Sequence, residues 1–213
     1  MLTARRFYID RFLSKYKYLI KDSIIDVGGS KKASRGFFEL TKKMKKRRKV
    51  LNINPQHLPD YLLSIEKKIK IEEKFSTVIL TEVIEYIDNI DLALTNILGF
   101  SEDKSLLIMT WPWMNSFHGD KKYDYKRYSD IYIKNKLISN GYEILFIESN
   151  GGVFSVIWDF FYKLNYTNNN KYFRRIVNLI LKFTFKFTLL MDFLFDTSDH
   201  ITTGFGLVAR REI

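Results

Sequence analysis

Two glycines behind a short apolar run give this sequence its first candidate ligand site. Residues 24–27 are three aliphatic side chains interrupted by Asp26, and Gly28 and Gly29 follow directly. The run predicts a strand buried on both faces, and glycine lets the backbone turn sharply beside a ligand because it has no Cβ. Residues 34–40 look like the first turns of a helix. Strand, turn and helix N-terminus would cradle a nucleotide-like ligand; a turn with no ligand is the alternative.

A polar residue also follows the next apolar run. Residues 50–55 predict a second short strand that Pro55 stops. Asn52 stands where α/β nucleotide sites usually carry a carboxylate for the ribose hydroxyls. A carboxamide can also hydrogen-bond a hydroxyl, although without the charge that strengthens the bond. Asn52 is therefore the expected ribose ligand of such a site.

The composition is that of one globular domain with an anionic partner. The 213 residues are 46% hydrophobic, enough for a single core. Lys and Arg outnumber Asp and Glu by 35 to 24, and the net charge of +11 suits nucleic acid, acidic lipid or a phosphorylated substrate. With no cysteine and three scattered histidines, disulfides and thiolate metal sites are excluded and no metal is expected. No long apolar run follows the basic N-terminus, so we expect a cytoplasmic protein.

The elements that would position these residues alternate between strands and helices. A leading helix over residues 4–22 should cover the sheet with its basic side chains turned outward. Further strands are expected over residues 59–66, 75–80, 105–110 and 142–148, and further helices over residues 81–98 and 129–140. This alternation predicts a mainly parallel, doubly wound α/β sheet with helices on both faces.

Several of these stretches together resemble the motifs of class I S-adenosylmethionine-dependent methyltransferases. Residues 24–30 are similar to the family's first motif, residues 52–55 to the second and residues 75–87 to the fourth. Residues 117–129 are similar to a subset associated with cell-surface glycan biosynthesis. The resemblance covers residues 20–150 and a last strand at 204–211.

That resemblance has consequences for the fold and the domain organisation. It implies a Rossmann-like, mainly parallel sheet of seven strands. Residues 1–213 would form a single domain, with a hydrophobic helical insertion at residues 151–198 before the last strand.

The resemblance also implies an S-adenosylmethionine site at the strand ends. Eight residues would form it: Asp26, Gly28, Gly29, Asn52, Ile53, Ile65, Thr81 and Glu82. The glycines would approach the methionyl end, Asn52 would bind the ribose, and the two isoleucines would flank the adenine. Asp26 would orient the loop or, through water, the ammonium group. Thr81 and Glu82, at the end of the fourth strand, would face the methyl donor.

For transfer to an oxygen, His118 is the expected general base. It follows the fifth strand at the substrate side and can titrate near neutrality; a loop histidine with a structural hydrogen bond is the alternative. Asp124 and Arg127 either pair to fix this loop or contact a sugar or phosphate. The chain departs from the family's residues at Ser30, Asn52, Ser64, Ser76 and Tyr86. Because each lost polar contact weakens binding by about 1 kcal/mol, a degenerate site is a further alternative.

Residues 172–195 are aromatic-rich and basic, and Lys182 and Lys186 interrupt them too early for a membrane-spanning helix. The stretch predicts either an insertion packed on the sheet or in a homodimer, or an amphipathic helix on an anionic bilayer. In the second case the protein would be peripheral on the inner face of the cytoplasmic membrane.

By resemblance, the chain would methylate a hydroxyl of a sugar or a related small or lipid-linked acceptor in cell-surface glycan biosynthesis. Two other functions stay open. The net charge and the basic run at residues 42–49 favour an RNA methyltransferase, although such a run is also typical of a solvated helix end. The departures from the family motifs favour a non-catalytic scaffold of this fold at the membrane surface.

Overall fold

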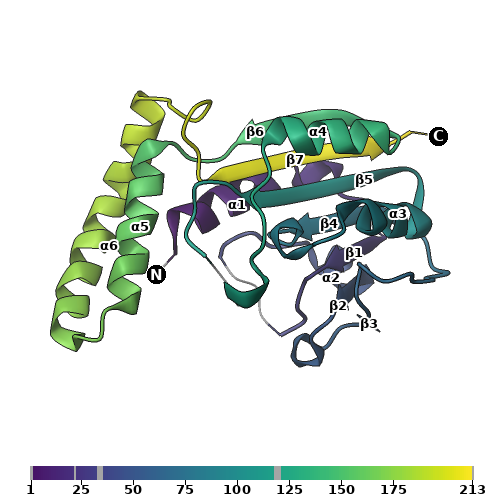
Figure 1. Ribbon diagram of the computed structural model, residues 1–213, viewed down its shortest axis with the longest axis horizontal. Helices are drawn as coiled ribbons and strands as arrows, with labels where there is room; N and C mark the ends of the chain where they lie inside the picture. Colours follow the sequence, from purple (N-terminus) through teal and green to yellow (C-terminus); the bar gives the residue numbers. More distant parts are fainter. Residues whose placement is uncertain (1, 22, 33–35, 118–120, 213) are drawn as a thin grey trace.

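Seven strands form one sheet in the order β3-β2-β1-β4-β5-β7-β6 (Figure 1). The structure is a computed structural model and describes residues 2–21, 23–32, 36–117 and 121–212. The strands are β1 (Ile24–Val27), β2 (Arg48–Asn52), β3 (Tyr61–Leu62), β4 (Phe75–Thr81), β5 (Ser101–Pro112), β6 (Tyr142–Ser149) and β7 (Gly204–Arg211). β7 runs antiparallel to β5 and β6, and the four pairs from β3 to β5 are parallel. The expected seven-stranded, mostly parallel sheet is confirmed.

The register brings the carboxyl ends of the central strands to one edge. Val27 of β1 lies opposite Leu51 of β2 and Leu80 of β4. The turn after β1 therefore lies level with Asn52 on one side and Thr81 on the other. This is the edge at which open α/β sheets bind ligands.

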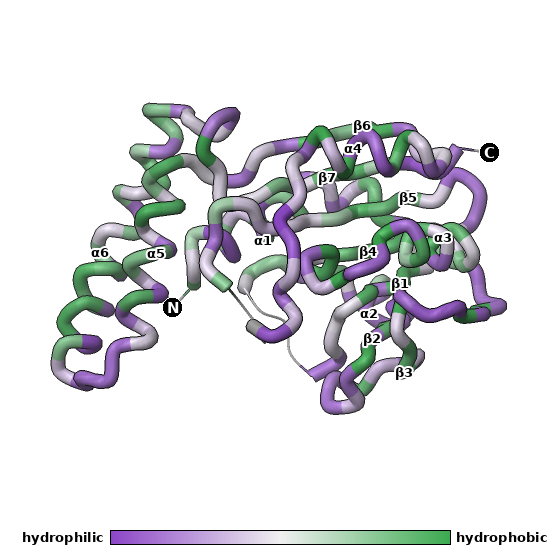
Figure 2. The backbone as a smooth tube through the Cα atoms, in the orientation of Figure 1, coloured by the Kyte–Doolittle hydropathy of each residue, from purple (hydrophilic) through white to green (hydrophobic). Residues whose placement is uncertain are grey.

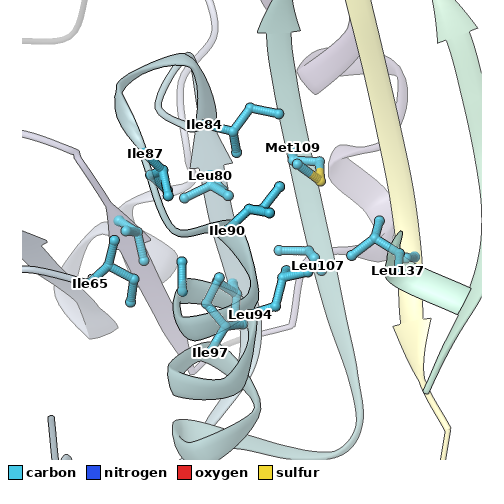
Figure 3. Close-up of a cluster of buried hydrophobic side chains, with 14 of the residues drawn as sticks. Ile65, Leu80, Ile84, Ile87, Ile90, Leu94, Ile97, Leu107, Met109 and Leu137 are labelled. Atoms are coloured by element: carbon cyan, nitrogen blue, oxygen red, sulfur yellow. The ribbon is translucent and has the colours of Figure 1, made fainter. Parts of the chain in front are cut away.

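Helices cover both faces of the sheet. The helices are α1 (Ala4–Lys15), α2 (Lys42–Arg47), α3 (Ile90–Phe100), α4 (Asp130–Ser139), α5 (Val153–Thr167) and α6 (Lys171–Leu194). On one face, side chains of α3 and α4 such as Leu94 and Leu137 pack with Leu80, Leu107 and Met109 of the strands (Figure 3). On the other face, α1 packs through an apolar cluster of its own. The helices that flank the strand ends are thus held rigidly.

Three expected helical segments differ from the structure. The leading helix, expected over residues 4–22, ends at Lys15 and is followed by a short 3-10 helix, η1 (Lys17–Leu19). The described part of residues 34–40 is not helical, because Gly36 has a φ of +84° and the Phe37 amide donates to Asp10 Oδ2 at 2.7 Å instead of to a helical carbonyl. After β4 the chain does not enter a helix directly, since Glu82 adopts a left-handed φ of 53°. A short 3-10 helix, η3 (Ile84–Tyr86), intervenes before α3 begins behind its cap, Asn89.

Between β6 and β7 the chain forms a helical hairpin of α5 and α6 that stands away from the sheet (Figure 1). α5 packs against α1, and α6 packs against α5. Because α6 is one layer removed from the sheet, its 24 residues include three buried ones, Leu181, Thr188 and Asp192. The expectation that this segment packs on the sheet is therefore wrong. Among the described residues, the helices are too short or too polar to cross a membrane.

Candidate active site

The turn after β1 requires glycine at two positions for steric reasons. Gly28 has a φ of +78° and donates its N–H to the Leu51 carbonyl at 2.8 Å. A Cβ there would stand 2.4 Å from Val83 Cγ2, and one on Gly29 would stand 2.2 Å from Asp26 Oδ2. The Asp26 carboxylate is thus folded beneath Gly29. The turn keeps its shape because side chains occupy the space behind it.

A half-buried ion pair holds the Asp26 carboxylate. Arg48 Nη1 lies 2.9 Å from Asp26 Oδ2, and Arg48 Nη2 donates to the Ser30 carbonyl at 3.0 Å. Burial raises the pKa of Asp26 to about 6, while the Arg48 guanidinium acts in the opposite direction. Arg48 therefore ties both ends of the glycine turn together. Sequence reasoning missed it by counting it within the basic run at residues 42–49, although it opens a strand that neighbours β1.

Asn52 connects the glycine turn to the loop after β2. Its Nδ2 donates to the Gly29 carbonyl at 2.8 Å, and its Oδ1 accepts from the Asn54 N–H at 2.9 Å. One N–H and one lone pair of the carboxamide are left to a ligand. An aspartate could not donate to Gly29, which gives the departure from an acid at this position a structural reason.

The two isoleucines that were expected to flank the adenine differ strongly in exposure. Ile53 is 71% exposed, whereas Ile65 is 6% exposed within the main core. Ile53 directly follows Asn52 at the carboxyl end of β2 and remains a candidate for an adenine contact. His118 lies outside the described residues.

Glu82 is held by an arginine from the first helix. Arg5 Nη2 lies 2.5 Å from Glu82 Oε1 and also donates to the Trp111 carbonyl at 2.8 Å. Thr110 Oγ1 donates to the same carboxylate at 3.0 Å. Arg5 is 3% exposed, so the expectation that α1 turns its basic side chains outward is wrong for this residue. The buried guanidinium of Arg5 links Glu82, directly after β4, to the carboxyl end of β5.

Thr81, beside this ion pair, carries a buried hydroxyl. Its Oγ1 has no hydrogen-bond partner among the residues that the structure describes. It lies at the carboxyl end of β4, level with the glycine turn. A buried polar atom at such an edge is suited to a ligand.

Asp124 and Arg127 form a pair within the loop after β5. Arg127 contacts both carboxylate oxygens, with Nη2 at 2.9 Å from Oδ2, and the Asp124 side chain is fully buried while that of Arg127 is 23% exposed. The Tyr125 N–H donates to the Glu85 carbonyl at 3.0 Å, so the loop is fixed to η3. Burial raises the pKa of Tyr86, and the nearby carboxylates of Glu85 and Asp124 add to this effect.

An open groove of about 690 Å³ lies next to this loop. It is bounded by the N-terminal turns of α3 and α4 and by the end of β5, and its lining includes Trp113, Lys126, Arg127, Tyr128 and Tyr132. The rings of Tyr128 and Tyr132 stack at 5.2 Å. The groove combines aromatic faces with charged groups and lies on the α3 and α4 side of the strand ends.

The structure thus arranges the expected site residues in two groups. Asp26, Gly28, Gly29, Asn52 and Thr81 gather around the ends of β1, β2 and β4. Asp124 and Arg127 lie in the loop after β5, where Arg127 borders the groove. Glu82 stands between the two groups.

Known proteins share this arrangement of elements. The sequence matches no model of a protein family and no curated protein. Among solved structures, a SAM-dependent methyltransferase from Archaeoglobus fulgidus has a TM-score of 0.60 and 15% identity over 97% of this chain and 94% of that one. The 4+2 cyclase SpnF has a TM-score of 0.60 and 12% identity over 96% and 81% of the two chains.

A third structure is the O-methyltransferase from a trans-AT PKS multienzyme of Brevibacillus brevis in complex with S-adenosyl-L-homocysteine, with a TM-score of 0.59 and 9% identity over 95% and 71% of the two chains. At such identities the likeness concerns the fold, and the cyclase shows that one fold serves different reactions. The chain has the α/β Rossmann-like fold of class I S-adenosylmethionine-dependent methyltransferases.

Proposed function

We propose that this chain is a methyltransferase that binds S-adenosylmethionine over the glycine turn. The observation that carries the proposal is the turn itself, which closes at the carboxyl end of β1 through two glycines, where an added Cβ would collide with Val83 or Asp26. The buried hydroxyl of Thr81, which has no partner among the described residues, lies beside it. A backbone turn without Cβ atoms and a polar atom that still lacks a partner are what a nucleoside with an amino-acid tail requires.

The residues present fit this cofactor. The backbone of Gly28 and Gly29 would receive the methionyl end, and the remaining N–H and lone pair of Asn52 would meet the ribose hydroxyls. Asp26, held by Arg48, would fix the turn and attract the ammonium group. The exposed side chain of Ile53, just after β2, would cover one face of the adenine.

When bound, S-adenosylmethionine supplies a methyl group activated by the positive sulfonium. The task of the chain is then to orient an acceptor in line with that methyl group and to take up the proton the acceptor loses. We assign proton uptake to His118 on its position after β5 in the sequence. Thr81 and Glu82 would border the reacting atoms from the end of β4.

For the acceptor, we infer a sugar or related polyhydroxylated molecule, free or lipid-linked, of a cell-surface glycan. The groove beside the strand ends supports this class, because Trp113 and Tyr128 offer aromatic faces while Lys126 and Arg127 offer charged donors. Arg127 keeps its guanidinium fixed through Asp124 and partly exposed, so it can donate to an acceptor oxygen.

Isothermal titration with S-adenosylmethionine and S-adenosylhomocysteine tests cofactor binding. A Gly28→Ala variant should lose most of the affinity, because its Cβ would meet Val83 and the φ of +78° is strained for alanine. Gly99→Ala is the matched control, since a Cβ there meets nothing within 4 Å. No heat with either ligand for a folded wild type would contradict the proposal and favour the non-catalytic scaffold.

A further inference from the structure

The outer helix of the hairpin carries an apolar face that the described residues do not cover. Six aliphatic and aromatic residues repeat every three or four positions along α6, and each is more than half exposed: Ile176, Ile180, Phe183, Phe187, Leu190 and Leu194. This spacing places them on one side of the helix, the apolar face of α6. Figure 2 shows that hydrophobic residues recur along α6 although it lies outside the sheet core. Exposed faces of this size mark an interaction surface.

The neighbouring helix extends the apolar face. Ile157, Phe160, Phe161 and Leu164 follow helical spacing along α5 and are 47%, 51%, 55% and 63% exposed. α5 and α6 pack side by side through their other faces, with Trp158 and Leu181 buried between them. The hairpin is therefore already closed on its inner side, and its outer side offers a broad apolar surface.

The charges of the hairpin are strongly one-sided. Its acidic residues, Asp159 and Asp192, are each 6% exposed. Asp159 accepts from the N–H groups of Ala4 and Arg5, and Asp192 accepts from Tyr8 and from amides at the start of α5. Both carboxylates therefore serve the inner contacts. The exposed charged residues of the hairpin are basic.

Four of the basic residues form a row beside the apolar face. They are Lys171, Arg175, Lys182 and Lys186, and all four are exposed. Intervals of four, seven and four residues place them on one side of the helix. We call them the basic stripe. An apolar face bordered by Lys and Arg is the pattern of helices that lie in a membrane interface.

We propose that the α5–α6 hairpin docks on an anionic lipid bilayer, with the apolar face of α6 in the acyl boundary and the basic stripe at the headgroups. Charge complementarity selects this occupant. A second copy placed on the same face would bring two basic stripes together while the hairpin carboxylates stay buried. An anionic leaflet supplies the negative charges that the hairpin itself does not expose.

The hairpin is also attached to the same edge of the sheet as the candidate site. It leaves the sheet after β6 and returns at Gly204, which pairs with Pro112 at the end of β5. Through Asp159 it holds the start of α1, from which Arg5 reaches Glu82. Docking would bring the edge that carries the glycine turn toward the lipid surface. The docking itself does not depend on cofactor binding.

Co-sedimentation with vesicles tests the proposal. Vesicles of phosphatidylcholine with phosphatidylglycerol are compared with vesicles of phosphatidylcholine alone, for the full chain. A variant with all four residues of the basic stripe changed to glutamine should bind the anionic vesicles about 600-fold more weakly, because each Lys or Arg near such a surface contributes about five-fold. Its matched control carries the same change at four exposed lysines elsewhere, Lys46, Lys67, Lys68 and Lys134, and should lose less than the stripe variant.

The apolar face is tested separately. Phe183 and Phe187 are 75% and 59% exposed, so changing both to serine should leave the fold intact and weaken vesicle binding by about ten-fold or more for each ring. Because the chain has no cysteine, Phe183→Cys can carry an environment-sensitive dye, with Ile131→Cys, at an exposed position of α4, as the control. Only the dye at position 183 should report an apolar environment when anionic vesicles are added.

Three results would overturn the proposal. The first is absence of binding to anionic vesicles by protein whose circular dichroism and cooperative urea unfolding show it to be folded. The second is equal binding to both vesicle types. The third is a stable dimer, seen by sedimentation equilibrium without lipid, that the Phe183→Ser and Phe187→Ser changes abolish. Titration with S-adenosylhomocysteine is a separate readout, so failure of docking and failure of the proposed cofactor site are distinguishable.

Discussion

Replacing Asn52 by aspartate would restore the acid that nucleotide sites usually carry, yet the structure predicts that it harms this protein. The Asn52 Nδ2 donates to the Gly29 carbonyl at 2.8 Å, and the side chain is buried. An aspartate would put a carboxylate oxygen against that carbonyl. The lost donor and the unpaired buried carbonyl cost about 1–3 kcal/mol. For a chain of this size the melting temperature should fall by about 2–4 °C for each kcal/mol.

Asn54→Asp is the matched control for this change. Asn54 Oδ1 accepts from the Gln56 N–H at 2.9 Å, and a carboxylate oxygen accepts equally well. Urea unfolding of wild type and both variants at neutral pH should therefore show a loss for Asn52→Asp and little change for Asn54→Asp. Titration with S-adenosylhomocysteine should show weaker binding for Asn52→Asp. If that variant is as stable as wild type and binds more tightly, the reasoning about Gly29 is refuted.

Three further predictions concern the ion pairs. Arg5→Ala should lower the free energy of unfolding by about 3–5 kcal/mol because it leaves the Glu82 carboxylate without its buried partner, and adding Glu82→Gln should recover part of the loss in urea denaturation. The pKa of Asp26 in the folded protein, about 6, lies above its usual value, so ionisation of this carboxyl opposes folding. The free energy of unfolding of Asp26→Asn, relative to wild type, should therefore rise by up to about 3 kcal/mol between pH 4 and pH 7. A difference between the two proteins that does not change with pH would contradict this prediction. Arg127→Ala should destabilise more than Asp124→Ala, since it removes the cationic partner of a fully buried carboxylate, whereas Arg127 is 23% exposed and can reach water. Equal losses of stability for the two variants would contradict this prediction.

The sheet could be predicted from the sequence because its signals are local. The apolar runs at residues 24–27 and 75–80 mark strands without reference to the rest of the chain, and the structure places strands there. The strand expected over residues 50–55 is also present, although it begins at Arg48 and ends at Asn52. The alternation with helices then leaves few topologies. Gly28 was predictable for the same reason, since a turn directly after a buried strand requires a residue that tolerates a positive φ.

The buried charges could not be predicted because their partners are distant in sequence. Arg5 and Glu82 are 77 positions apart, and the sequence shows their charges but not their burial. Arg48 looks like part of a basic run until β2 pairs with β1 and brings it to Asp26. Likewise, the periodicity of α6 predicts an amphipathic helix but not the surface on which it packs. The apolar face of α6 is exposed because α5 separates this helix from the sheet, which the sequence alone does not show.

Hydrogen exchange measured by mass spectrometry with and without S-adenosylhomocysteine tests the central claim most directly, because it locates the bound ligand along the chain. If the cofactor lies over the glycine turn, backbone amides at residues 27–31 and 52–54 should exchange more slowly with the ligand, and those of α6 should be unchanged. Gly28→Ala should abolish this protection and Gly99→Ala should retain it. Unchanged exchange at the glycine turn under saturating ligand, or protection confined to other segments, would contradict the account.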